Sequence, residues 1–414
     1  MKFGGTSVGD VDRIARVARI VASEAKPGRG LAVVVSAMAG ETDRLVGLAR
    51  GAGGHGGNGA LSGASFDDEY DVVVSAGEQV TTGLLALALR RLGLKARSWQ
   101  NWQIPFRTDA AHAKARVADF DTTDVGRSID EGVIAVVPGF QGITEENRIT
   151  TLGRGGSDTS AVALAAALKA ERCDIYTDVD GVYTTDPRIV SRARRLDKIS
   201  YEEMLEMASL GAKVLQTRSV ELAFAQRVPV RVLSSFVEPG APNPGTLVCA
   251  EDQIVEKHIV SGIAYSRDEA KITLLGVANS ISAEADIFSR LADAGVNVDM
   301  IVQTEARHEG KRNIVFTCPD REAPRAAETI EADRAKIGVD EIHVRRDVAK
   351  VSVIGIGMKS HIGAARTMFS ALAQKSINIE AIAASEIKIS VLIDAAYTEL
   401  AVRALHTAYG LDAA

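Results

Sequence analysis

The sequence predicts an α/β protein in which a mostly parallel sheet, covered by helices on both faces, is followed by two smaller α+β units. Two observations support this prediction. Up to about residue 235, short β-branched runs alternate with longer Ala- and Leu-rich stretches, and the short runs are apolar throughout, as strands buried on both faces are. Beyond residue 245, a segment that predicts strand, helix and strand occurs twice.

The alternation predicts a definite set of elements in the first part of the chain. Buried strands are expected at 30–36, 71–75, 133–137 and 228–233, and helices at 11–25, 79–92 and 157–169. The glycine-rich stretch from Gly51 to Gly63 neither follows a strand nor opens a helix. This favours a mobile surface insertion over a phosphate-binding loop.

A domain boundary is expected at Phe236–Gly245, where the prolines and glycines of FVEPGAPNPG end the alternation. The predicted domains are a first domain of residues 1–245, a unit of residues 258–340 and a unit of residues 348–414.

The two small units are predicted from an internal repeat. Lys271–Thr304 resembles Lys350–Ser385, with Asn297 corresponding to Asn378 and with two extra residues in the second copy. Each copy predicts strand, turn, helix and strand, and a further strand follows at 313–318 and at 388–393. This is a small α+β module used twice rather than a long repeat array.

Composition and charge exclude several classes of function. The net charge is −6 without clustered Lys and Arg, which argues against nucleic-acid binding. The cysteines, Cys173, Cys249 and Cys318, are far apart, which favours reduced core thiols over a metal site or disulfides. No signal peptide and no apolar run of about 20 residues is evident, so a cytoplasmic protein without a membrane span is expected.

The first candidate motif is KFGGTS at Lys2–Ser7, between a predicted strand and the helix that begins near Val11. Gly4 and Gly5 allow the backbone to come close to a ligand, and successive N–H groups with the hydroxyls form an anion cradle. Lys2 adds a full positive charge. Taken alone, this motif would be better explained as a tight strand-to-helix turn.

A second glycine-rich turn, TTLGRGGSDTS at Thr150–Ser160, precedes an Ala-rich helix. Two anion-binding helix N-termini in one domain suit a nucleotide phosphate and a substrate carboxylate. Arg154 can bind a carboxylate through two hydrogen bonds. Asp158 alone would only complement the helix dipole, but together with Arg154 and Ser157 it suits the two charges of an amino acid.

A third motif, TDVDGVYTTDPR at Thr177–Arg188, contains strong turn signals and could be a simple hairpin or loop. The functional interpretation is a nucleotide lid, with Tyr183 near the base, Asp178 on the ribose or adenine edge, and Arg188 on phosphate. Lys213 in GAKVL is a further candidate, although a lone lysine is usually only solvated.

Together these motifs resemble the aspartate kinase family. The resemblance rests on KFGGTSV, VVSAMAGETD, SAGEQ, GFQG, TTLGRGGSDTSA, TDVDGVYTTDPR and LGAKVLQTRSVELA, in this order, followed by a two-copy ACT-type regulatory region. It covers essentially the whole chain. It implies the amino-acid kinase fold with ferredoxin-like ACT units, ATP as phosphate donor and L-aspartate as acceptor.

The resemblance also implies roles for individual residues. Lys2, Arg154, Asp158 and Lys213 match the catalytic positions. The positions that hold aspartate are Ser36, Thr42, Glu78, Phe140, Arg154, Ser157 and Asp158. The positions that hold ATP are Lys2, Gly4, Gly5, Thr177, Asp178, Tyr183, Arg188 and Lys213.

The nucleophile predicts the kind of catalysis. A carboxylate is already ionised at neutral pH, so no general base is needed. The obstacle is that an anion must approach a polyanion, so the enzyme must neutralise the γ-phosphoryl oxygens and align the reactants. Lys2 and Lys213 are the predicted charge stabilisers. Mg²⁺ is expected to bind through the ATP phosphates, without a dedicated metal motif in the protein.

The ACT-type units resemble amino-acid sensors, which implies feedback by lysine, threonine or both and a homodimer or higher homo-oligomer. The candidate effector contacts are Asn279, Ser280, Ile281, Ser282, Glu284, Asn297, Asp299, Gln303, Ser360, His361, Asn378 and Glu386. For Asn297 and Asn378 the alternative is a left-handed turn residue before a strand.

Three positions depart from the family pattern. Met1 directly precedes Lys2 where several apolar residues are usual, which would shorten a core strand. Asn279–Ser282 replaces a Pro-Gly turn, and Ala384 stands where Thr is frequent. Three alternatives remain at this point: another amino-acid or carbamate kinase, a non-catalytic amino-acid sensor on the same fold, and, least favoured, a DNA-binding regulator.

Overall fold

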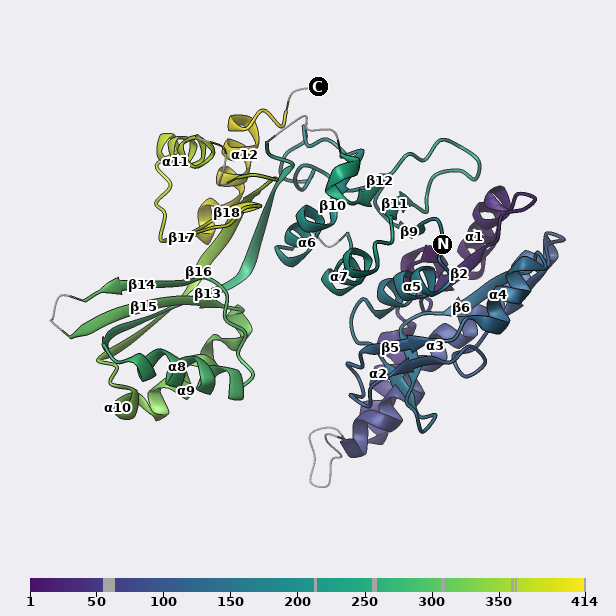
Figure 1. The fold of residues 1–414 in the computed structure, drawn as a ribbon, viewed down its shortest axis with the longest axis horizontal. Helices are drawn as coiled ribbons and strands as arrows, with labels where there is room; N and C mark the ends of the chain where they lie inside the picture. Colours follow the sequence, from purple (N-terminus) through teal and green to yellow (C-terminus); the bar gives the residue numbers. More distant parts are fainter. Residues whose placement is uncertain are drawn as a thin grey trace. The chain divides into compact units, whose positions relative to one another are not determined.

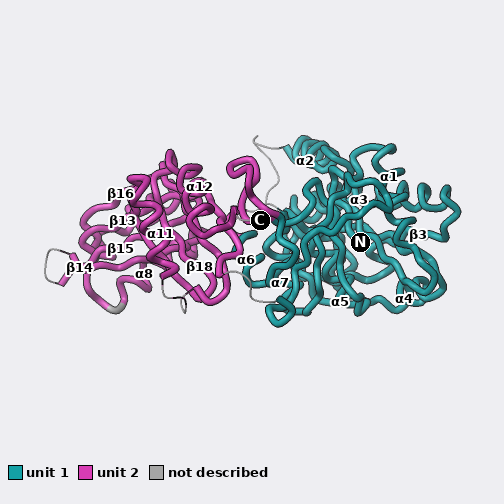
Figure 2. Tube along the Cα trace, turned by 90° about the horizontal axis from the view of Figure 1, so that it is seen from above, with its two compact units in different colours: residues 1–182, 195–208, 213–255 teal, residues 183–194, 209–212, 256–414 magenta. Residues whose placement is uncertain are grey.

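The computed structural model describes residues 1–54, 64–211, 214–254, 259–306, 310–358, 361 and 363–412, without the side chains of 64, 65 and 281. The chain divides into two compact units. Unit 1 comprises residues 1–182, 195–208 and 213–255, and unit 2 comprises residues 183–194, 209–212 and 256–414 (Figure 2). The second half of the Thr177–Arg188 motif therefore belongs to unit 2.

Unit 1 is built on a mostly parallel sheet in the order β10-β12-β11-β9-β1-β2-β6-β3, in which β12 runs antiparallel to β11 (Figure 1). Its strands are β1 (Lys2–Phe3), β2 (Ala32–Val35), β3 (Ala96–Ser98), β6 (Ile134–Pro138), β9 (Cys173–Thr177), β10 (Lys198–Ser200), β11 (Val230–Ser234) and β12 (Thr246–Cys249). The predicted strands 30–36, 133–137 and 228–233 are thus confirmed. The central strands are almost wholly apolar and buried because helices cover both faces of the sheet.

The helices of unit 1 are α1 (Val11–Glu24), α2 (Glu41–Ala52), α3 (Ala64–Arg91), α4 (Thr123–Asp130), α5 (Gly156–Ala167), α6 (Tyr201–Ser209) and α7 (Thr217–Gln226). Apolar residues of α1 and α3 pack on Val33 and Val35, while Val34 points to the side of α4 and α5. A smaller sheet in the order β5-β4-β7-β8 comprises β4 (Phe106–Thr108), β5 (Val117–Phe120), β7 (Gln141–Ile143) and β8 (Ile149–Thr151).

The expected strand at 71–75 is wrong, because Asp71–Ser75 lies inside the long helix α3, together with the helix expected at 79–92. Helix α3 packs against α1, α2 and β6, and this packing outweighs the strand preference of three consecutive valines. Residues 66–91 of α3 are also long and apolar enough to cross a membrane, contrary to the sequence expectation, but half of the most apolar window is buried within the domain. Most of the predicted 51–63 insertion lies outside the described residues.

Unit 2 contains the repeat, in a sheet of order β14-β15-β13-β16-β18-β17 (Figure 1). The first copy comprises β13 (Gly262–Ala278), α8 (Ile281–Asp293), β14 (Ile301–Glu305) and β15 (Lys311–Cys318), followed by α9 (Ala323–Ala332) and α10 (Arg334–Ile337). The second comprises β16 (Glu341–Ile354), α11 (Ala364–Gln374), β17 (Ala381–Ala384), β18 (Lys388–Asp394) and α12 (Thr398–Ala408). The predicted order of strand, helix, strand and strand is confirmed in both copies.

Candidate active site

The carboxyl ends of the parallel strands meet at one edge of the unit 1 sheet. Phe3 of β1 pairs with Val35 of β2 and Tyr176 of β9, and Val35 pairs with Pro138 of β6. The chain positions at or just beyond these ends therefore lie side by side: Gly4, Ser36, Gly139 and Thr177. Ligands of open α/β sheets bind at this edge, and all four of these residues belong to the motifs quoted above.

The closest charged contact at this edge joins Lys2 to Asp158. The Lys2 Nζ lies 2.5 Å from an Asp158 carboxylate oxygen, and each residue is only 8% exposed. Lys2 comes from β1 and Asp158 from the first turn of α5, so the fold brings together the KFGG and GRGGSD motifs. Lys2 reaches Asp158 from a strand of two residues. A buried ammonium paired with one carboxylate is poised to exchange that partner for an anionic ligand.

The glycines of both motifs permit close backbone approach. A Cβ on Gly5 would lie 3.0 Å from the Ala37 carbonyl oxygen, and one on Gly4 would lie 3.4 Å from Lys2 Nζ. Gly155 has φ +70°, and a Cβ there would lie 1.8 Å from the Gln216 side chain. Gly155 directly precedes α5. Because glycine has no side chain, the turn can adopt this conformation and present the N–H groups of the helix N-terminus.

Glu78 of α3 is a second buried acidic group beside the strand ends. Its Oε1 accepts a hydrogen bond of 2.9 Å from the Ala37 N–H, whereas its Oε2 is buried without a hydrogen-bond partner among the described residues. Burial raises the pKa of Glu78 to about 7. Helix α3 can approach Ala37 this closely because residue 77 is glycine. A Cβ at this position would lie only 2.7 Å from the Ala37 side chain. The unpartnered oxygen suits an incoming ammonium group.

Phe140 lies beyond β6 in a left-handed conformation, with φ +69°. Its N–H donates to Ser160 Oγ at 3.1 Å, and its carbonyl accepts from the Leu152 N–H at 2.8 Å, so α5 and the chain before Gly153 both hold it. Strained residues of this kind cluster at binding sites. A Cβ on Gly139 would lie 2.7 Å from the Ser157 Cβ, which places buried Ser157 beside the same turn.

The remaining predicted aspartate contacts surround this group. Ser36 directly follows β2 and Thr42 lies in the first turn of α2, both partly buried. Arg154 is exposed between Gly153 and Gly155, both of which have positive φ. Ser36, Thr42 and Phe140 thus follow strands β2 and β6, Arg154, Ser157 and Asp158 lie at the start of α5, and Glu78 lies on α3; their joint role in holding aspartate stays a prediction.

The predicted ATP positions are divided between the two units. Thr177 ends β9, and its Oγ1 donates to the carboxylate of the exposed Asp178 at 3.1 Å. Tyr183 and Arg188 lie in unit 2, where Arg188 is 87% exposed at its side chain and forms a bidentate pair with Asp186. Lys213 lies outside the described residues, so its predicted role stays a prediction.

Asp71, Ser75 and Thr82 are buried polar residues of the same helix as Glu78 and were not among the predicted site residues. They lie at i−7, i−3 and i+4 relative to Glu78. A polar stripe at helical spacing in an otherwise apolar segment was the signal that could have identified them. Arg218 was also missed, although it lies within the LGAKVLQTRSVELA motif; its contacts are described below.

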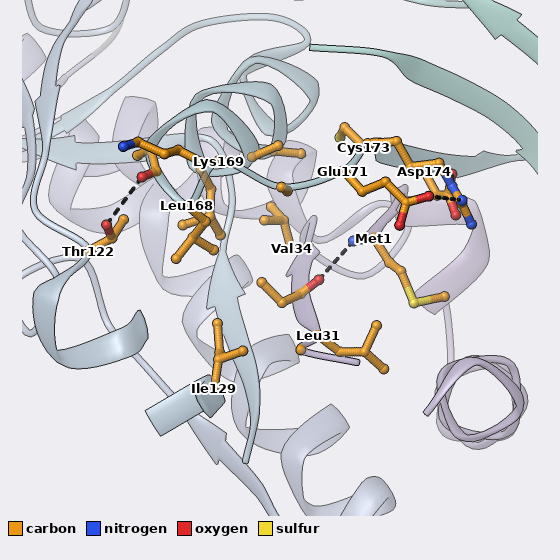
Figure 3. A pocket seen from close by; sticks show the side chains of 18 of the residues that line it. Met1, Leu31, Val34, Thr122, Ile129, Leu168, Lys169, Glu171, Cys173 and Asp174 are labelled. Carbon is orange, nitrogen blue, oxygen red and sulfur yellow. Dashed lines mark hydrogen bonds and ion pairs between the residues drawn. The ribbon is translucent and has the colours of Figure 1, made fainter. Parts of the chain in front are cut away.

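A cavity of about 470 Å³ lies away from the catalytic motifs, towards the amino ends of β2 and β9 (Figure 3). Its lining includes Ala32, Val34 and Cys173, with Ile129 of α4 and Leu168 directly after α5. The Met1 ammonium donates to the Ala32 carbonyl oxygen at 2.7 Å beside this cavity.

In unit 2 most of the predicted effector contacts of the first copy lie at the start of α8 or, like Gln303, contact it, whereas Asn297 donates its backbone N–H to Glu322 and Asp299 pairs with Lys350. Glu284 accepts a hydrogen bond of 3.0 Å from Gln303 of β14 and also pairs with Arg312 of β15. Ser280 and Ser282 have hydroxyl oxygens 3.4 Å apart. Asn279 donates its backbone N–H to Gly310, and the side chain of Ile281 is outside the described set.

The predicted contacts of the second copy are less clustered. His361 Nδ1 is 2.9 Å from the Gly357 carbonyl oxygen, and the Glu386 carbonyl accepts from the Met358 N–H at 2.8 Å. Asn378 is exposed. Ser360 lies outside the described residues.

The left-handed alternative for the two asparagines is wrong, because neither Asn297 nor Asn378 has positive φ. The left-handed residues lie two positions earlier, at Gly295 with φ +67° and at Ser376 with φ +55°. Each directly follows the turn that ends a helix, which is the usual place for this conformation.

Repeat symmetry also appears as reciprocal ion pairs between the two copies. Lys350 of the second copy lies 2.5 Å from Asp299 of the first, and Lys271 of the first lies 3.0 Å from Glu380 of the second. The four positions correspond under the repeat. Lys350 is also 2.6 Å from buried Glu269. The predicted effector residue Asp299 therefore already has a lysine partner.

Comparison with known protein families agrees with this architecture. The amino acid kinase family matches residues 1–234, and the ACT domain matches residues 272–333 and 351–409. An aspartate kinase of Stutzerimonas stutzeri is 51% identical over 413 residues, covering 100% of this chain and 97% of that protein. Aspartokinase 2 of Bacillus subtilis is 44% identical, covering 99% of this chain and 97% of that protein.

Solved structures give the same result. Aspartokinase III of E. coli in complex with aspartate and ADP, in the R-state, matches with a TM-score of 0.79 at 29% identity and covers 98% of both chains. The same enzyme in complex with lysine and aspartate, in the T-state, matches with a TM-score of 0.75 at 29% identity, covering 99% of this chain and 98% of that one. The chain therefore belongs to the amino acid kinase family and, within it, to the aspartate kinases that carry C-terminal ACT domains.

Proposed function

We propose that the protein transfers the γ-phosphate of ATP to the side-chain carboxylate of L-aspartate, forming 4-phospho-L-aspartate and ADP. The observation that carries the proposal is the buried Lys2–Asp158 pair at the shared carboxyl edge of β1, β2, β6 and β9. This pair connects the KFGG turn with the GRGGSD turn. The two reactants, ATP and the aspartate carboxylate, are both anionic and must meet close to these turns. The E. coli relative solved with aspartate and ADP supports this pair of ligands.

Substrate recognition follows from the charges at the site. Aspartate carries one ammonium and two carboxylates, so its pocket needs both signs of charge. The unpartnered Oε2 of Glu78 and the carboxylate of Asp158 suit the ammonium. Arg154 and the hydroxyls of Ser36, Thr42 and Ser157 suit the carboxylates.

Catalysis follows from the same charges. An aspartate carboxylate oxygen attacks the γ-phosphorus, the bond to the bridging oxygen breaks, and ADP leaves with the electron pair. Lys2 neutralises charge on the transferring group, and the N–H groups at the N-terminus of α5 add positive potential. Asp158 keeps the Lys2 ammonium in place before the substrates bind.

ATP and Mg²⁺ are the proposed cofactors, with Thr177, Asp178, Tyr183, Arg188 and Lys213 as further nucleotide contacts. In the described ranges no cluster of three His, Cys, Asp or Glu side chains could hold a metal ion. We expect a magnesium ion to bind chiefly through the ATP phosphates and water, where it would neutralise phosphate charge.

Unit 2 is the proposed regulatory half, with lysine, threonine or both as effectors. The E. coli relative solved with lysine supports an amino-acid ligand.

We also propose a homodimer or higher homo-oligomer formed through the ACT units. The edge strands β14 and β17 carry exposed Ile301 and Ile382, and such edges pair readily with a second chain. The proposed place of the enzyme is the cytoplasm, at the first step of lysine, threonine and methionine biosynthesis, including the branch through diaminopimelate.

Trapping the product as its hydroxamate tests the proposal. Purified protein is incubated with ATP, Mg²⁺, L-aspartate and hydroxylamine, with and without lysine and threonine. We expect aspartyl hydroxamate that decreases when an effector is added. Folded protein that binds an amino acid but forms no product would instead support the alternative of a non-catalytic sensor.

A further inference from the structure

The buried carboxylate of Asp71 holds two segments together near the aspartate-binding turn. Asp71 lies on α3 and is 0% exposed. Its Oδ1 accepts a hydrogen bond of 2.5 Å from Thr151 Oγ1, and its Oδ2 accepts one of 3.0 Å from the Ala113 N–H. His112 Nδ1 lies 2.9 Å from the same Oδ2. One side chain thereby fixes both the end of β8 and the loop between β4 and β5.

Arg218 of α7 also joins the segment that follows β8 to the loop between β4 and β5. It lies in the first turn of α7 and donates from Nη1 to the Leu152 carbonyl oxygen at 2.9 Å and from Nη2 to the Ala115 carbonyl oxygen at 2.7 Å. The Ala115 N–H also donates to the Thr151 carbonyl at 2.9 Å. Two carbonyls bound by one planar guanidinium keep a fixed separation, which a single ammonium group cannot reproduce.

These contacts end immediately before the Gly153–Arg154–Gly155 turn. Gly153 has φ +76°, and a Cβ there would lie 3.2 Å from the Ala113 carbonyl oxygen, so the turn rests directly on the loop that Asp71 holds. Ala113 itself has φ +63°, a conformation that a non-glycine residue keeps only when its surroundings fix it.

We propose that Asp71 and Arg218 are positioning residues for aspartate binding, which act by fixing the turn that carries Arg154. The inference rests on the proposed function. Neither side chain belongs to the predicted substrate contacts. Their effect reaches the substrate through Leu152 and Gly153, which set the direction of Arg154. A displacement of about 1 Å in such a group can lower the rate about 100-fold.

The test is steady-state kinetics of Asp71→Asn and Arg218→Lys in the full chain. The first substitution keeps the size of the side chain but removes one acceptor oxygen, and the second keeps the charge but removes the double contact. We expect the KM for aspartate to rise about tenfold or more in each variant, with the KM for ATP within about twofold of wild type. A binding measurement with aspartate alone should show the same loss.

Asp174→Asn is the matched control. Asp174 is also a buried carboxylate of unit 1, but its partners Arg172 and Arg231 lie away from the turn. We expect this variant to lower the Tm while leaving the KM for aspartate unchanged. A purely structural role for Asp71 and Arg218 would give the pattern of the control, with a lower Tm and normal KM values, and would overturn the inference.

The inference and the proposed function fail in different ways. Wild-type protein that forms no aspartyl phosphate would refute the proposed function. Active wild-type protein with two variants of normal aspartate KM would refute the positioning role alone. A variant can be too unstable for kinetic assays at about 25 °C. In that case its Tm is measured with and without aspartate, in a scan that starts at a lower temperature. The rise in Tm with aspartate then compares the aspartate affinity of the variant with that of wild type.

Discussion

Replacing Glu78 with glutamine should stabilise the protein without ligand and weaken its binding of aspartate. Glu78→Gln keeps the shape of the side chain and the oxygen that accepts from the Ala37 N–H. It removes a charge that is buried without a partner at its second oxygen. A buried carboxylate with no cation nearby costs free energy until a ligand ammonium neutralises it.

The size and the sign of the effect follow from the pKa. Burial raises the pKa of Glu78 from 4.5 to about 7, a shift that corresponds to about 3 kcal/mol at most. Since the folded state holds this proton more tightly than the unfolded state, wild-type stability falls as the pH rises from about 4.5 to about 7 and is constant above that. The glutamine variant lacks this loss. Its advantage should be near zero at about pH 4.5 and reach about 1–3 kcal/mol at about pH 8.

The assay is thermal unfolding of both proteins without ligand from about pH 4.5 to about pH 8. For a domain of this size, 1 kcal/mol corresponds to about 2–4 °C in Tm, so a difference of several degrees is expected at the upper end of this range. Aspartate should bind better as the pH rises towards about 7 in wild type, because only the ionised carboxylate attracts the ammonium. The reasoning would be refuted if the Tm difference between Glu78→Gln and wild type did not change with pH. It would also be refuted if both proteins had the same KM for aspartate at alkaline pH.

Three further predictions concern the motifs and the thiols. Lys2→Ala should lower kcat about 100-fold or more, because one preorganised charge is lost; stopped-flow or steady-state assays at saturating substrate measure this. Gly155→Ala should lower kcat/KM at least about tenfold through strain and a clash, whereas Gly28→Ala, at φ +78° with open space around it, should show normal kinetics. Burial raises the pKa of Cys173 to about 12 and that of Cys318 to about 11, so both should react with a thiol reagent at about pH 8 only after unfolding.

Each of these predictions has a clear contrary result. Near-normal turnover in Lys2→Ala would remove this lysine from the chemical step. Equal losses in the two glycine variants would show that backbone strain, and not the contact at the turn, causes the effect. Rapid labelling of native protein would show that the thiols are accessible.

The sequence predicted the parallel sheet well because its strands are buried on both faces, so their apolar runs are unambiguous. It failed at 71–75, where consecutive valines indicated a strand. There the decisive signal was the helical spacing of Asp71, Ser75, Glu78 and Thr82, whose polar side chains are all buried inside the domain. The period of the polar residues was more informative than the type of the apolar ones.

Close backbone approach was predictable where a motif contains adjacent glycines, as at Gly4 and Gly5. Contacts between distant segments were not predictable, because only the fold brings together Lys2 and Asp158, or Arg218 and Ala115. The left-handed turns of unit 2 were misplaced by two residues, since the helix C-terminus and not the asparagine determines where the chain reverses.

The cavity beside Met1 has a practical consequence for handling this protein. The Met1 ammonium already donates to Ala32 in the direction of the β2 ladder. The apolar side chains of Val34, Leu164 and Leu168 line this space, so a polyhistidine tag attached at this end without a spacer would bring polar groups close to them.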